Sequence, residues 1–506
     1  MNPTVSSSSV VRDPDVAATA MMTKRAWWLV GLNILVPGSA QVLAGSRRFG
    51  RFALGTTLLF WALAVVVILA LLIGREAVLP FLAQPAVLWA LAVVLGLYGV
   101  LWIVCALDTL RLTRLPRVDR RARAAVSMLA IVALLATGGV AIGAASAAGI
   151  TAGVLAKLNS NTIDITGPNG KPIAVGPLTG PVNILLVGSD SGGGNPAYGV
   201  RGEALNDVTI LIHLSPVSKS VTAMSIPRDL YVPQAACGSK PAGGLARFNT
   251  ALARGGLNCV VAAAAQLTGL PIQYAAEIQF DGVVAMSDAV GGVPVCLASA
   301  INDPYTGLNI TAGQHTLQGA DALAFLRTRH GLSTGSDLQR ISNQQVFLSS
   351  LMRTVKSSET LGNPVKVIAL AQAASEHMQL STQLAQISTM VSMAIALRGI
   401  PLARIAFVQY PSTPVTVRGQ SVTMPDTGAA ATLIAAIAAD QAVATQTLGG
   451  AAVSSGTPGA GSGAGAGAGA TPSPSATPTV AAPVTLPPVV SGQAANQSTC
   501  STGQTG

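Results

Sequence analysis

Three long apolar stretches near the start of the chain limit what it can fold into more than any other feature: residues 53–74, 85–107 and 125–150. Each carries almost no charge, and as a helix each is long enough to cross a hydrocarbon core of about 30 Å. We therefore expect a helical membrane region over residues 26–150 with three spans, followed by a separate folded part.

The stretch 26–45 is also apolar, but helix breakers and polar side chains interrupt it. The interrupting residues are Asn33, Pro37, Gly38 and Gln41. Because proline and glycine disfavour the interior of a helix, we expect a broken or re-entrant hairpin here instead of a plain span. Residues 1–25 are expected to form a disordered cytoplasmic N-terminus.

The net charge of +10 belongs mainly to the membrane region. Residues 1–150 contain 13 Lys and Arg against 5 Asp and Glu, whereas residues 151–506 contain 17 against 15. The densest basic cluster is Arg111, Arg114, Arg117, Arg120, Arg121 and Arg123. Because positively charged loops stay in the cytoplasm, the span 125–150 should carry the rest of the chain to the extracellular side of the cell membrane. The later part has little excess charge, so we expect no nucleic acid partner.

After the membrane region, short apolar strand-like runs alternate with helix-like runs, which predicts an α/β fold with a mixed sheet flanked by helices. The expected strands are 182–187, 208–214, 221–225, 274–279, 293–297 and 404–410. The expected helices are 257–267, 280–290, 338–357, 364–377, 381–397 and 427–439. We expect a stalk over 151–180, the main folded domain over 181–442, and a disordered tail over 443–506. The tail is rich in Gly, Ala, Pro, Ser and Thr, and such a composition cannot bury a core.

Arginines and amides gather in residues 317–346 of an otherwise charge-poor chain. Arg327 and Arg329 are two positions apart, so they point to one side only if the helix ends near residue 326 and the chain is then extended. One face of a following helix is predicted to carry Asp337, Arg340 and Gln344. Guanidinium forks bind phosphate oxygens in pairs, so a diphosphate clamp is one interpretation. The other is a solvated, salt-bridged helix face.

Charged residues also stand at the ends of three predicted strands. Asp190 follows the first strand, Asp207 precedes the second, and Arg228 follows the third. Side chains at strand ends converge in many α/β ligand sites. A single Asp at such a position can instead serve the turn, and this reading stays open for each of the acids.

The five cysteines show no CxxC or His/Cys spacing typical of a metal site. Cys237 and Cys259 flank one connection between a loop and a helix in the exported part, so we expect them to form a disulfide. Cys296 lies in an apolar strand and is expected to be a buried thiol. Cys105 belongs to a membrane span and Cys500 to the tail.

Several motifs occur in an order that resembles the LytR-CpsA-Psr family. They are N-I-L-L-V-G-S-D (183–190), N-D-V-T-I-L-I-H (206–213), S-I-P-R-D (225–229), F-D-G-V-V-A-M-S-D-A-V-G-G-V (280–293), L-R-T-R-H (326–330) and D-L-Q-R-I-S-N-Q-Q (337–345). Proteins of that family are membrane-anchored extracytoplasmic phosphotransferases. They move glycopolymers from a polyprenyl-diphosphate carrier onto peptidoglycan. The high Ala and Gly content and the several spans resemble actinobacterial members.

The resemblance implies a role for each matching residue. The catalytic residues would be Arg228, Arg327, Arg329 and Asp207. The diphosphate would be bound by Arg228, Arg327, Arg329, Arg340 and Gln344. Asp190 and Asp207 would hold Mg²⁺ or Mn²⁺. The family often has an arginine two residues before the second acid, whereas this chain has Leu205. Either the clamp works with one arginine fewer, or Arg201 or Arg247 takes its place.

The sequence therefore favours a phosphotransferase whose partners are a polyprenyl-diphosphate-linked glycopolymer, peptidoglycan and membrane lipid. A module that binds polyprenyl diphosphate or wall polymer without catalysis remains an alternative, as does a diphosphatase that uses water as acceptor. A transporter is disfavoured, because the spans lack charged residues at their centres. The helix 260–270 is a candidate lining for the polyprenyl chain, with ordinary core packing as the alternative.

The basic cluster at 111–123 yields a first testable prediction about topology. Protease added to intact, wall-stripped cells should degrade residues 160–506 and spare the arginine-rich loop, because that loop should face the cytoplasm. Immunoblots against each region would follow the two fates, and lysed cells should lose both. Protection of residues 160–506 in intact cells would contradict the predicted orientation.

Overall fold

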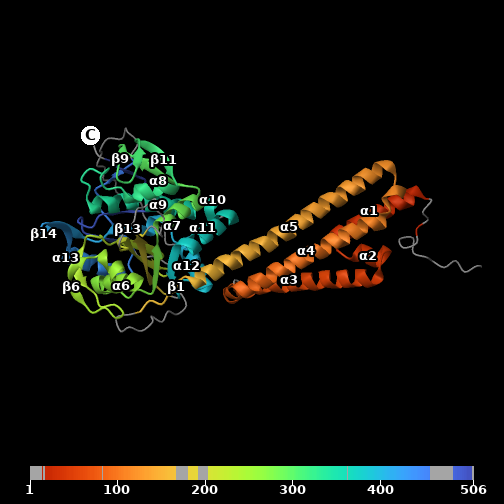
Figure 1. Cartoon of the computed structure of the whole chain (residues 1–506), viewed down its shortest axis with the longest axis horizontal. Coiled ribbons are helices and arrows are strands. Elements are labelled where there is room, and N and C mark those ends of the chain that lie inside the picture. Colours follow the sequence, from red (N-terminus) through yellow and green to blue (C-terminus); the bar gives the residue numbers. More distant parts are fainter. Residues whose placement is uncertain are drawn as a thin grey trace, which may run out of the picture. The chain divides into compact units, whose positions relative to one another are not determined.

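The computed structural model describes residues 14, 18–82, 84–166, 180–191, 203–361, 363–455 and 482–503. The chain divides into two compact units, Met1–Ala156 and Lys157–Gly506, and each is described by itself. Figure 1 labels the helices and some of the strands.

The first unit is helical. Its elements are α1 (Thr19–Leu35), α2 (Ser39–Ala44), α3 (Arg47–Leu82), α4 (Pro85–Thr113), the 3-10 turn η1 (Leu115–Arg117) and most of α5 (Arg120–Ser160). Three segments are long and apolar enough to cross a membrane: Arg47–Gly74, Ala86–Arg117 and Arg120–Leu158. They correspond to the three predicted spans.

Between α1 and α2 the helix breaks at Val36–Gly38, where Gly38 has a φ of +92°. A Cβ atom on Gly38 would lie 2.5 Å from the backbone N of Leu54, so glycine permits the close approach of α2 to α3. Beyond the break, Gln41 is buried. Its Nε2 donates to the carbonyl O of Cys105 (2.8 Å) and to Thr109 Oγ1 (2.9 Å), which fixes α2 against α4.

The second unit is built on an eight-stranded sheet with strand order β1-β12-β7-β2-β3-β4-β13-β19. These strands are β1 (Thr162–Ile163), β2 (Val182–Ser189), β3 (Asn206–Ser215), β4 (Ser220–Ser225), β7 (Tyr274–Ile278), β12 (Met378–Ser381), β13 (Ile405–Gln409) and β19 (Gly492–Ala494). β2, β3 and β4 are antiparallel neighbours, whereas β7 is parallel to β2 and β13 to β4. The predicted mixed sheet is therefore confirmed.

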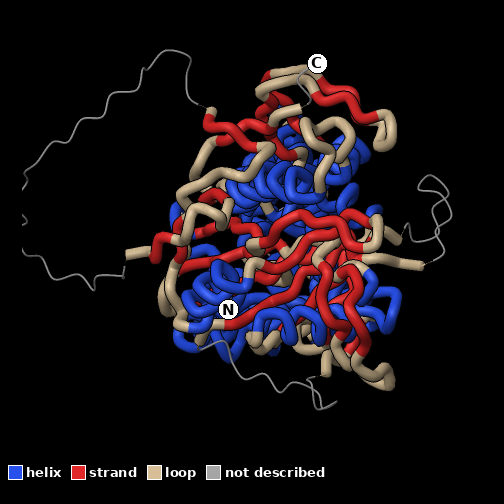
Figure 2. Tube along the Cα trace, turned by 90° about the vertical axis from the view of Figure 1, so that its left-hand side faces the viewer, coloured by secondary structure: helices blue, strands red, loops and turns tan. Residues whose placement is uncertain are grey.

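Helices cover both faces of this sheet (Figure 2). The helices of the unit are α6 (Thr250–Thr268), α7 (Phe280–Val290), α8 (Gly319–Arg327), α9 (Asp337–Lys356), α10 (Ser358–Leu361), α11 (Pro364–His377), α12 (Ile387–Gly399) and α13 (Thr427–Ala438). One core joins the sheet to α6 and α13 through Leu257 and Leu433, and another joins it to α9 through Leu348. Because successive strand residues point to opposite faces, Leu211 of β3 belongs to the first core and Ile210 to the second.

Smaller strand groups complete the unit. A four-stranded sheet has the order β11-β8-β20-β17. Its strands are β8 (Val293–Leu297), β11 (Gly313–Leu317), β17 (Ala452–Ser454) and β20 (Thr499–Ser501). Two-stranded pairs are formed by β5 (Tyr231–Gln234) with β6 (Gly243–Arg247), β9 (Ile301–Asp303) with β10 (Leu308–Ile310), β14 (Ser412–Val417) with β15 (Gln420–Pro425), and β16 (Val443–Ala444) with β18 (Val484–Thr485).

The structure corrects the expectation that residues 443–506 form a disordered tail. Residues 443–455 and 482–503 belong to the folded unit, and 456–481 lie outside the described residues. β19 pairs with the edge of β13, and β20 pairs with β8. The composition of the tail is too poor to bury a core alone, but its strands need only the open edges of sheets that already exist.

The expectation that Cys296 is a buried thiol is also wrong. Cys296 in β8 forms a disulfide with Cys500 in β20, with a Cα–Cα distance of 4.4 Å. The two residues are partners in adjacent strands. The sequence could not indicate this pair, because 204 positions separate the two cysteines and one of them lay in the presumed tail.

The expected stalk over residues 151–180 needs a correction too. Helix α5 continues to Ser160, and Thr162 of β1 then pairs with Leu380 of β12 at the edge of the main sheet. Residues 167–179 lie outside the described residues. The described part of 151–180 is therefore helix and edge strand.

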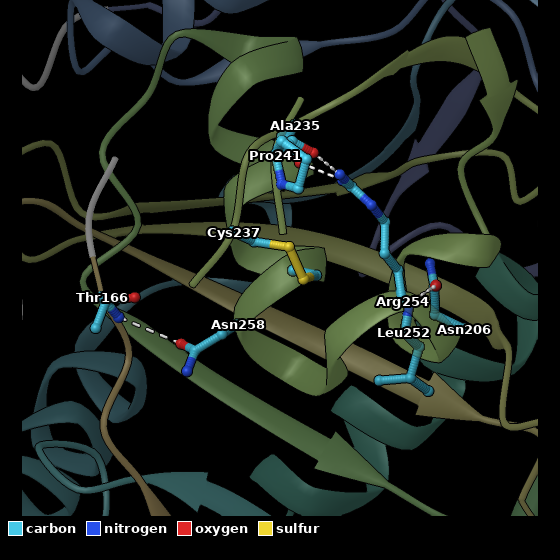
Figure 3. Close-up of a disulfide and its surroundings, with 9 residues drawn as sticks. Thr166, Asn206, Ala235, Cys237, Pro241, Leu252, Arg254 and Asn258 are labelled. Atoms are coloured by element: carbon cyan, nitrogen blue, oxygen red, sulfur yellow. Dashed lines mark hydrogen bonds between the residues drawn. A yellow bond between two sulfur atoms is a disulfide. The ribbon is translucent and has the colours of Figure 1, made fainter. Parts of the chain in front are cut away.

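The disulfide Cys237–Cys259 is present, as predicted, with a Cα–Cα distance of 5.0 Å (Figure 3). It joins the loop between β5 and β6 to α6. Gly255 makes room for it, because a Cβ atom there would lie 2.4 Å from Cys259 Sγ. Arg254 adds two hydrogen bonds to the same loop, to the carbonyl groups of Ala235 and Pro241.

The second disulfide generates a prediction about stability. Cys500→Ser should lower the free energy of unfolding by about 2–4 kcal/mol, because the bond closes a long loop of the unfolded chain. In a thermal melt of the purified full chain this corresponds to roughly 5–10 °C. Cys105→Ser is the control, since Cys105 is not disulfide-bonded and lies in the first unit. Mass spectrometry of non-reduced peptides that showed free Cys296 and Cys500 would contradict the pairing.

Candidate functional site

A β-bulge between β2 and β3 sets the direction of the Asp207 side chain. Gly188 pairs with Val208, but the next pair joins Ser189 to Asn206, so Asp207 is an extra residue in β3. Such a bulge re-aims a side chain. Asp207 and Val208 consequently line the same cavity, although neighbouring residues of a regular strand face opposite sides of a sheet.

The backbone on both sides of Asp207 is fixed. Asp190, directly after β2, is 2% exposed. Its Oδ1 accepts a hydrogen bond from the N–H of Leu205 (2.7 Å), and its own N–H donates to the carbonyl O of Leu205 (3.0 Å). From α6, the N–H of Leu252 donates to Asn206 Oδ1 (3.2 Å; Figure 3). Asp190 therefore ties the end of β2 to the start of β3.

Arg228, in the turn after β4, lies among three carboxylates. Its Nη1 donates to Asp207 Oδ1 at 2.6 Å, and its Nε lies 3.8 Å from Oδ1 of both Asp229 and Asp337. Burial lowers the pKa of Arg228, but attraction by Asp207, Asp229 and Asp337 outweighs burial, so the pKa is raised above its ordinary value. The guanidinium is therefore a fixed positive charge.

A buried carboxylate, Asp303, positions the second pair of arginines. Its Oδ2 accepts hydrogen bonds from Thr328 Oγ1 (2.7 Å), the N–H of Arg329 (3.0 Å) and the N–H of His330 (3.1 Å). A Cβ atom on Gly331 would lie 3.0 Å from Thr328 Oγ1 and 3.2 Å from the Cβ of Asp303, so glycine lets the turn close over the carboxylate. These contacts end α8 and extend the chain at Thr328 (φ −59°, ψ 136°).

Arg327 is the last residue of α8 and faces α7. The Cζ atom of its guanidinium lies 4.4 Å from the centroid of the Phe280 ring, which is a cation–π contact. Arg327 also lines the cavity described below. The ring thus restricts this arginine to the side of α8 on which the other site residues lie.

Helix α9 contributes one face to the site, as predicted. Arg340 Nη2 lies 2.6 Å from Asp337 Oδ1 and donates to the carbonyl O of Asp207 (2.8 Å). Gln344 Nε2 donates to the carbonyl O of Leu326 (2.9 Å). Asp337, Arg340 and Gln344 are 3–4% exposed. The alternative of a solvated helix face is therefore wrong.

The arginines leave hydrogen-bonding capacity unused. The buried Nε atoms of Arg228, Arg329 and Arg340 have no hydrogen-bond partner. Within the described part of the chain, Arg329 forms no ion pair. Burial, followed by repulsion from Arg228 and Arg340, lowers the pKa of Arg329. An unsatisfied buried donor costs about 1–3 kcal/mol, so an oxyanion with several oxygens would relieve both the unpaired donors and the repulsion.

An apolar cavity of about 310 Å³ adjoins these groups. Asp207, Arg327, Arg340 and Gln344 contribute to its wall. The apolar lining includes Leu186, Ile210, Val283, Met286, Val290, Phe347, Leu351 and Leu370. The predicted lining helix 260–270 does not contribute, because α6 packs in the core on the other face of the sheet. Charged donors and an apolar space thus meet in one place, which suits an amphiphilic anion.

The donor chemistry of the two predicted metal ligands fits a hard cation. Across the described residues, no group of three or more His, Cys, Asp and Glu could hold a metal ion. Asp190 and Asp207 are only two carboxylates, but Mg²⁺ takes one or two protein carboxylates and completes its shell with water and substrate oxygens. A cation on Asp207 Oδ1 would share that atom with Arg228.

Leu205 occupies the position, two residues before Asp207, at which the family often has an arginine. Leu205 holds Asp190 through its backbone and has no charge to offer. Of the two candidate replacements, Arg201 lies outside the described residues. Arg247, in β6, has its Nε 3.7 Å from Asp229 Oδ1, and Arg228 contacts the same oxygen. Arg247 is therefore adjacent to Arg228.

Two supporting residues were missed from the sequence. Asp303 stands before Pro304 and Tyr305, so it resembled an ordinary turn residue. Asn343, on α9, donates through Nδ2 to the carbonyl O of Phe325 (2.7 Å) and thereby ties α9 to α8. The amide-rich run D-L-Q-R-I-S-N-Q-Q was the available signal for Asn343, since so many buried polar side chains on one helix need partners.

Comparison with known proteins agrees with this arrangement of motifs. The model of the LytR_cpsA_psr family matches residues 154–438. The cell wall biosynthesis protein LcpA of Corynebacterium glutamicum is 32% identical over 272 residues, which cover 47% of this chain and 52% of LcpA. The polyisoprenyl-teichoic acid–peptidoglycan teichoic acid transferase TagU of Bacillus cereus is 30% identical over 182 residues, covering 36% and 55%.

Among solved structures, the LytR-Csp2A-Psr enzyme from Actinomyces oris is 24% identical. The match covers 55% of this chain and 94% of that one, with a TM-score of 0.42. The chain spans about half the length of the curated relatives it matches.

Asp303 provides a test of how the site is held. Asp303→Ala should destabilise the second unit by about 3–5 kcal/mol, because it leaves several buried donors without an acceptor. Burial raises the pKa of Asp303, but hydrogen bonds from Thr328, Arg329 and neighbouring amides lower it more, so the pKa lies below its ordinary value. The stabilisation should therefore be complete near neutral pH and be lost as the pH falls below the ordinary pKa of an aspartate, about 3.9, and on through the lower pKa of the folded state.

Chemical denaturation of the purified full chain between pH 3 and 7 would measure this difference. Asp321→Ala, which removes an exposed acid from α8, is the matched control and should change little. Equal stability of Asp303→Ala and the unmodified protein at pH 7 would contradict the role given to Asp303.

Proposed function

The chain belongs to the LytR-CpsA-Psr family, and from this premise we propose that its second unit is a phosphotransferase that moves a glycopolymer from a polyprenyl-diphosphate carrier onto peptidoglycan. The observation that carries the proposal is that the buried Nε atoms of Arg228, Arg329 and Arg340 lack hydrogen-bond partners, and that Arg340 also lines an apolar cavity. A diphosphate satisfies the donors, and a polyprenyl chain fills the cavity.

The arginines would act on charge that develops during transfer. An acceptor hydroxyl forms a new bond to the phosphorus that bears the glycopolymer, while the bond from that phosphorus to the bridging oxygen breaks and polyprenyl phosphate leaves. Negative charge shifts onto the bridging and terminal oxygens. Pre-organised donors aimed at those oxygens stabilise the transition state without rearrangement. Arg228, Arg327, Arg329 and Arg340 supply the donors, and Gln344 holds α9 against the end of α8.

A base must take the proton of the acceptor hydroxyl, and a carboxylate is the available group. Asp229, Asp190 and Asp207 are the candidates. Asp207 is already paired with Arg228 at 2.6 Å and with Arg340 at 3.6 Å, which weakens it as a base. Asp190 and Asp207 would also hold Mg²⁺ or Mn²⁺, which when bound would neutralise part of the charge on the diphosphate.

The polyprenyl chain would occupy the cavity between the sheet and helices α7, α8, α9 and α11. Its apolar lining gives a hydrocarbon chain a dry surface, and burial contributes about 25 cal/mol per Å² of apolar area removed from water. The three candidate membrane helices would keep the unit at the membrane in which such carriers reside. The basic loop at 111–123, which should face the cytoplasm, supports a location of the unit on the outer side.

The names of two relatives support a choice of acceptor and of transferred group for the proposed reaction. TagU of Bacillus cereus is named as a transferase of teichoic acid to peptidoglycan, and LcpA of Corynebacterium glutamicum as a cell wall biosynthesis protein. We propose peptidoglycan as the acceptor of this chain as well, and a wall glycopolymer as the transferred group.

The proposal predicts how arginine variants behave. Arg228→Ala, Arg329→Ala and Arg340→Ala should each lower the rate of polymer transfer by roughly 10²-fold or more, the scale of losing one pre-organised donor. Lysine should restore only part of the rate, because an ammonium lacks the planar fork. The measurement is transfer from a polyprenyl-diphosphate-linked saccharide to peptidoglycan by the purified full chain in detergent. Arg418→Ala, an exposed arginine in the turn after β14, is the control and should leave the rate unchanged.

Thermal melts of all variants must accompany the rates. If Arg329→Ala melts normally and transfers at the parent rate, the diphosphate clamp is wrong. Release of free phosphate without transfer would identify a diphosphatase. Tight binding of the carrier with no product of either kind would identify a binding module.

A further inference from the structure

Two exposed aromatic rings contact each other in a tilted arrangement, and one of them directly follows Arg329 in the sequence. The ring centroids of Tyr305 and His330 are 4.1 Å apart, with an interplanar angle of 33°. Tyr305 is 76% exposed, and His330 is exposed as well. Neither residue lines the apolar cavity. The pair therefore presents aromatic surface to the solvent and is separate from the space assigned to the polyprenyl chain.

The buried carboxylate of Asp303 holds the backbone of both aromatic residues and of Arg329. Asp303 Oδ1 accepts a hydrogen bond from the N–H of Tyr305 (3.0 Å), and Oδ2 accepts from the N–H groups of Arg329 (3.0 Å) and His330 (3.1 Å). Asp303 itself is fully buried. The backbone of the ring pair is thus rigidly related to that of Arg329, although Tyr305 and His330 come from distant parts of the sequence.

The pair is also close to the arginine site. His330 directly follows Arg329, so their Cα atoms are about 3.8 Å apart. The charge of Arg329 interacts with Arg228 and Arg340. Groups that adjoin a diphosphate bound by Arg329 would therefore lie near the backbone that carries the rings.

The chemistry of the rings selects the class of ligand. An ordered, exposed aromatic face attracts flat, weakly polar surfaces, because contact removes apolar area from water and engages the π-system. A pyranose ring has such a face, formed by its axial C–H groups, with hydroxyl groups around the rim. Tyr305 adds a hydroxyl and His330 a ring nitrogen, which can hydrogen-bond to that rim.

We propose that Tyr305 and His330 form a stacking platform for a pyranose ring of a glycan that reaches the arginine site. The proposal rests on the proposed function, since it takes the arginines as the diphosphate site. The glycan is either the first sugars of the transferred polymer or a strand of the acceptor. Both have the same ring chemistry, and the experiment separates them.

Binding of three probes to the full chain in detergent micelles tests the platform. The first is polyprenyl diphosphate without sugar, the second is the same lipid bearing N-acetylglucosamine, and the third is a set of soluble peptidoglycan glycan strands. The variants are Tyr305→Ala, His330→Ala and Tyr305→Phe, which keeps the ring. Val365→Ala, a 73% exposed apolar residue on α11, is the control.

Tyr305→Ala should weaken one saccharide probe by about threefold to tenfold, the scale of one aromatic contact. Tyr305→Phe should lose less binding than Tyr305→Ala because it keeps the ring, Val365→Ala should bind like the parent, and the sugar-free lipid should bind equally to the parent and to all four of these variants. Weakening of the second probe assigns the platform to the donor, and weakening of the third assigns it to the acceptor. Unchanged binding of both saccharide probes to Tyr305→Ala and His330→Ala would overturn the proposal, as would equal weakening of the sugar-free lipid.

This outcome can be distinguished from failure of the proposed function. Arg329→Ala should weaken the sugar-free lipid in the same assay, and no effect there would reject the diphosphate site. The glycan strands carry no diphosphate, so their response to Tyr305→Ala tests the platform by itself. Thermal melts should show no change for Tyr305→Ala, because most of the side chain is already in water.

Discussion

Arginines can be buried side by side only when carboxylates are buried with them, because an unpaired charge in the interior costs several kcal/mol. Here the negative charges of Asp207 and Asp337 offset the positive charges of Arg228 and Arg340 through ion pairs. The four residues come from β3, the turn after β4 and the first turns of α9. The network therefore ties the sheet to the helix that carries Gln344 and Asn343. Arg329 forms no ion pair among the described residues, and burial together with repulsion from Arg228 and Arg340 lowers its pKa, which supports the proposal that the site binds an anion.

The sequence predicted the framework of this site because its signals are local. Apolar runs of strand length located β2, β3 and β4, and the spacing of Asp337, Arg340 and Gln344 placed them on one face of α9. The bulge at Asp207 was not predictable, because it depends on how β2 and β3 pair across 16 positions of sequence. Asp303 was missed for a related reason. A lone Asp before a proline resembles turn chemistry, and only the fold brings it under Thr328 and Arg329.

The composition of residues 482–503 predicted disorder, because composition does not reveal that a segment can pair with strands elsewhere in the fold. Residues 482–503 are too poor in large apolar side chains to fold alone, yet they supply β19 and β20 and bury Cys500. They also form hydrogen bonds with α9. Gln493 Nε2 donates to the carbonyl O of Gln345 (2.9 Å), and Arg353 Nη1 donates to the carbonyl O of Ala495 (2.8 Å). The helix that carries Arg340 is thus also held in place by this segment.

The bond between Cys296 and Cys500 changes what a cut in the backbone would do. Hydrolysis of any single peptide bond between residues 456 and 481 would leave residues 482–503 covalently attached through the sulfur atoms. The strand pairing of β19 with β13 would keep the fragment in register. Removing the segment therefore takes two independent chemical events, one hydrolytic and one reductive. The same arrangement sets an order for biosynthesis, since the edge of β13 stays open until residues 492–494 have left the ribosome.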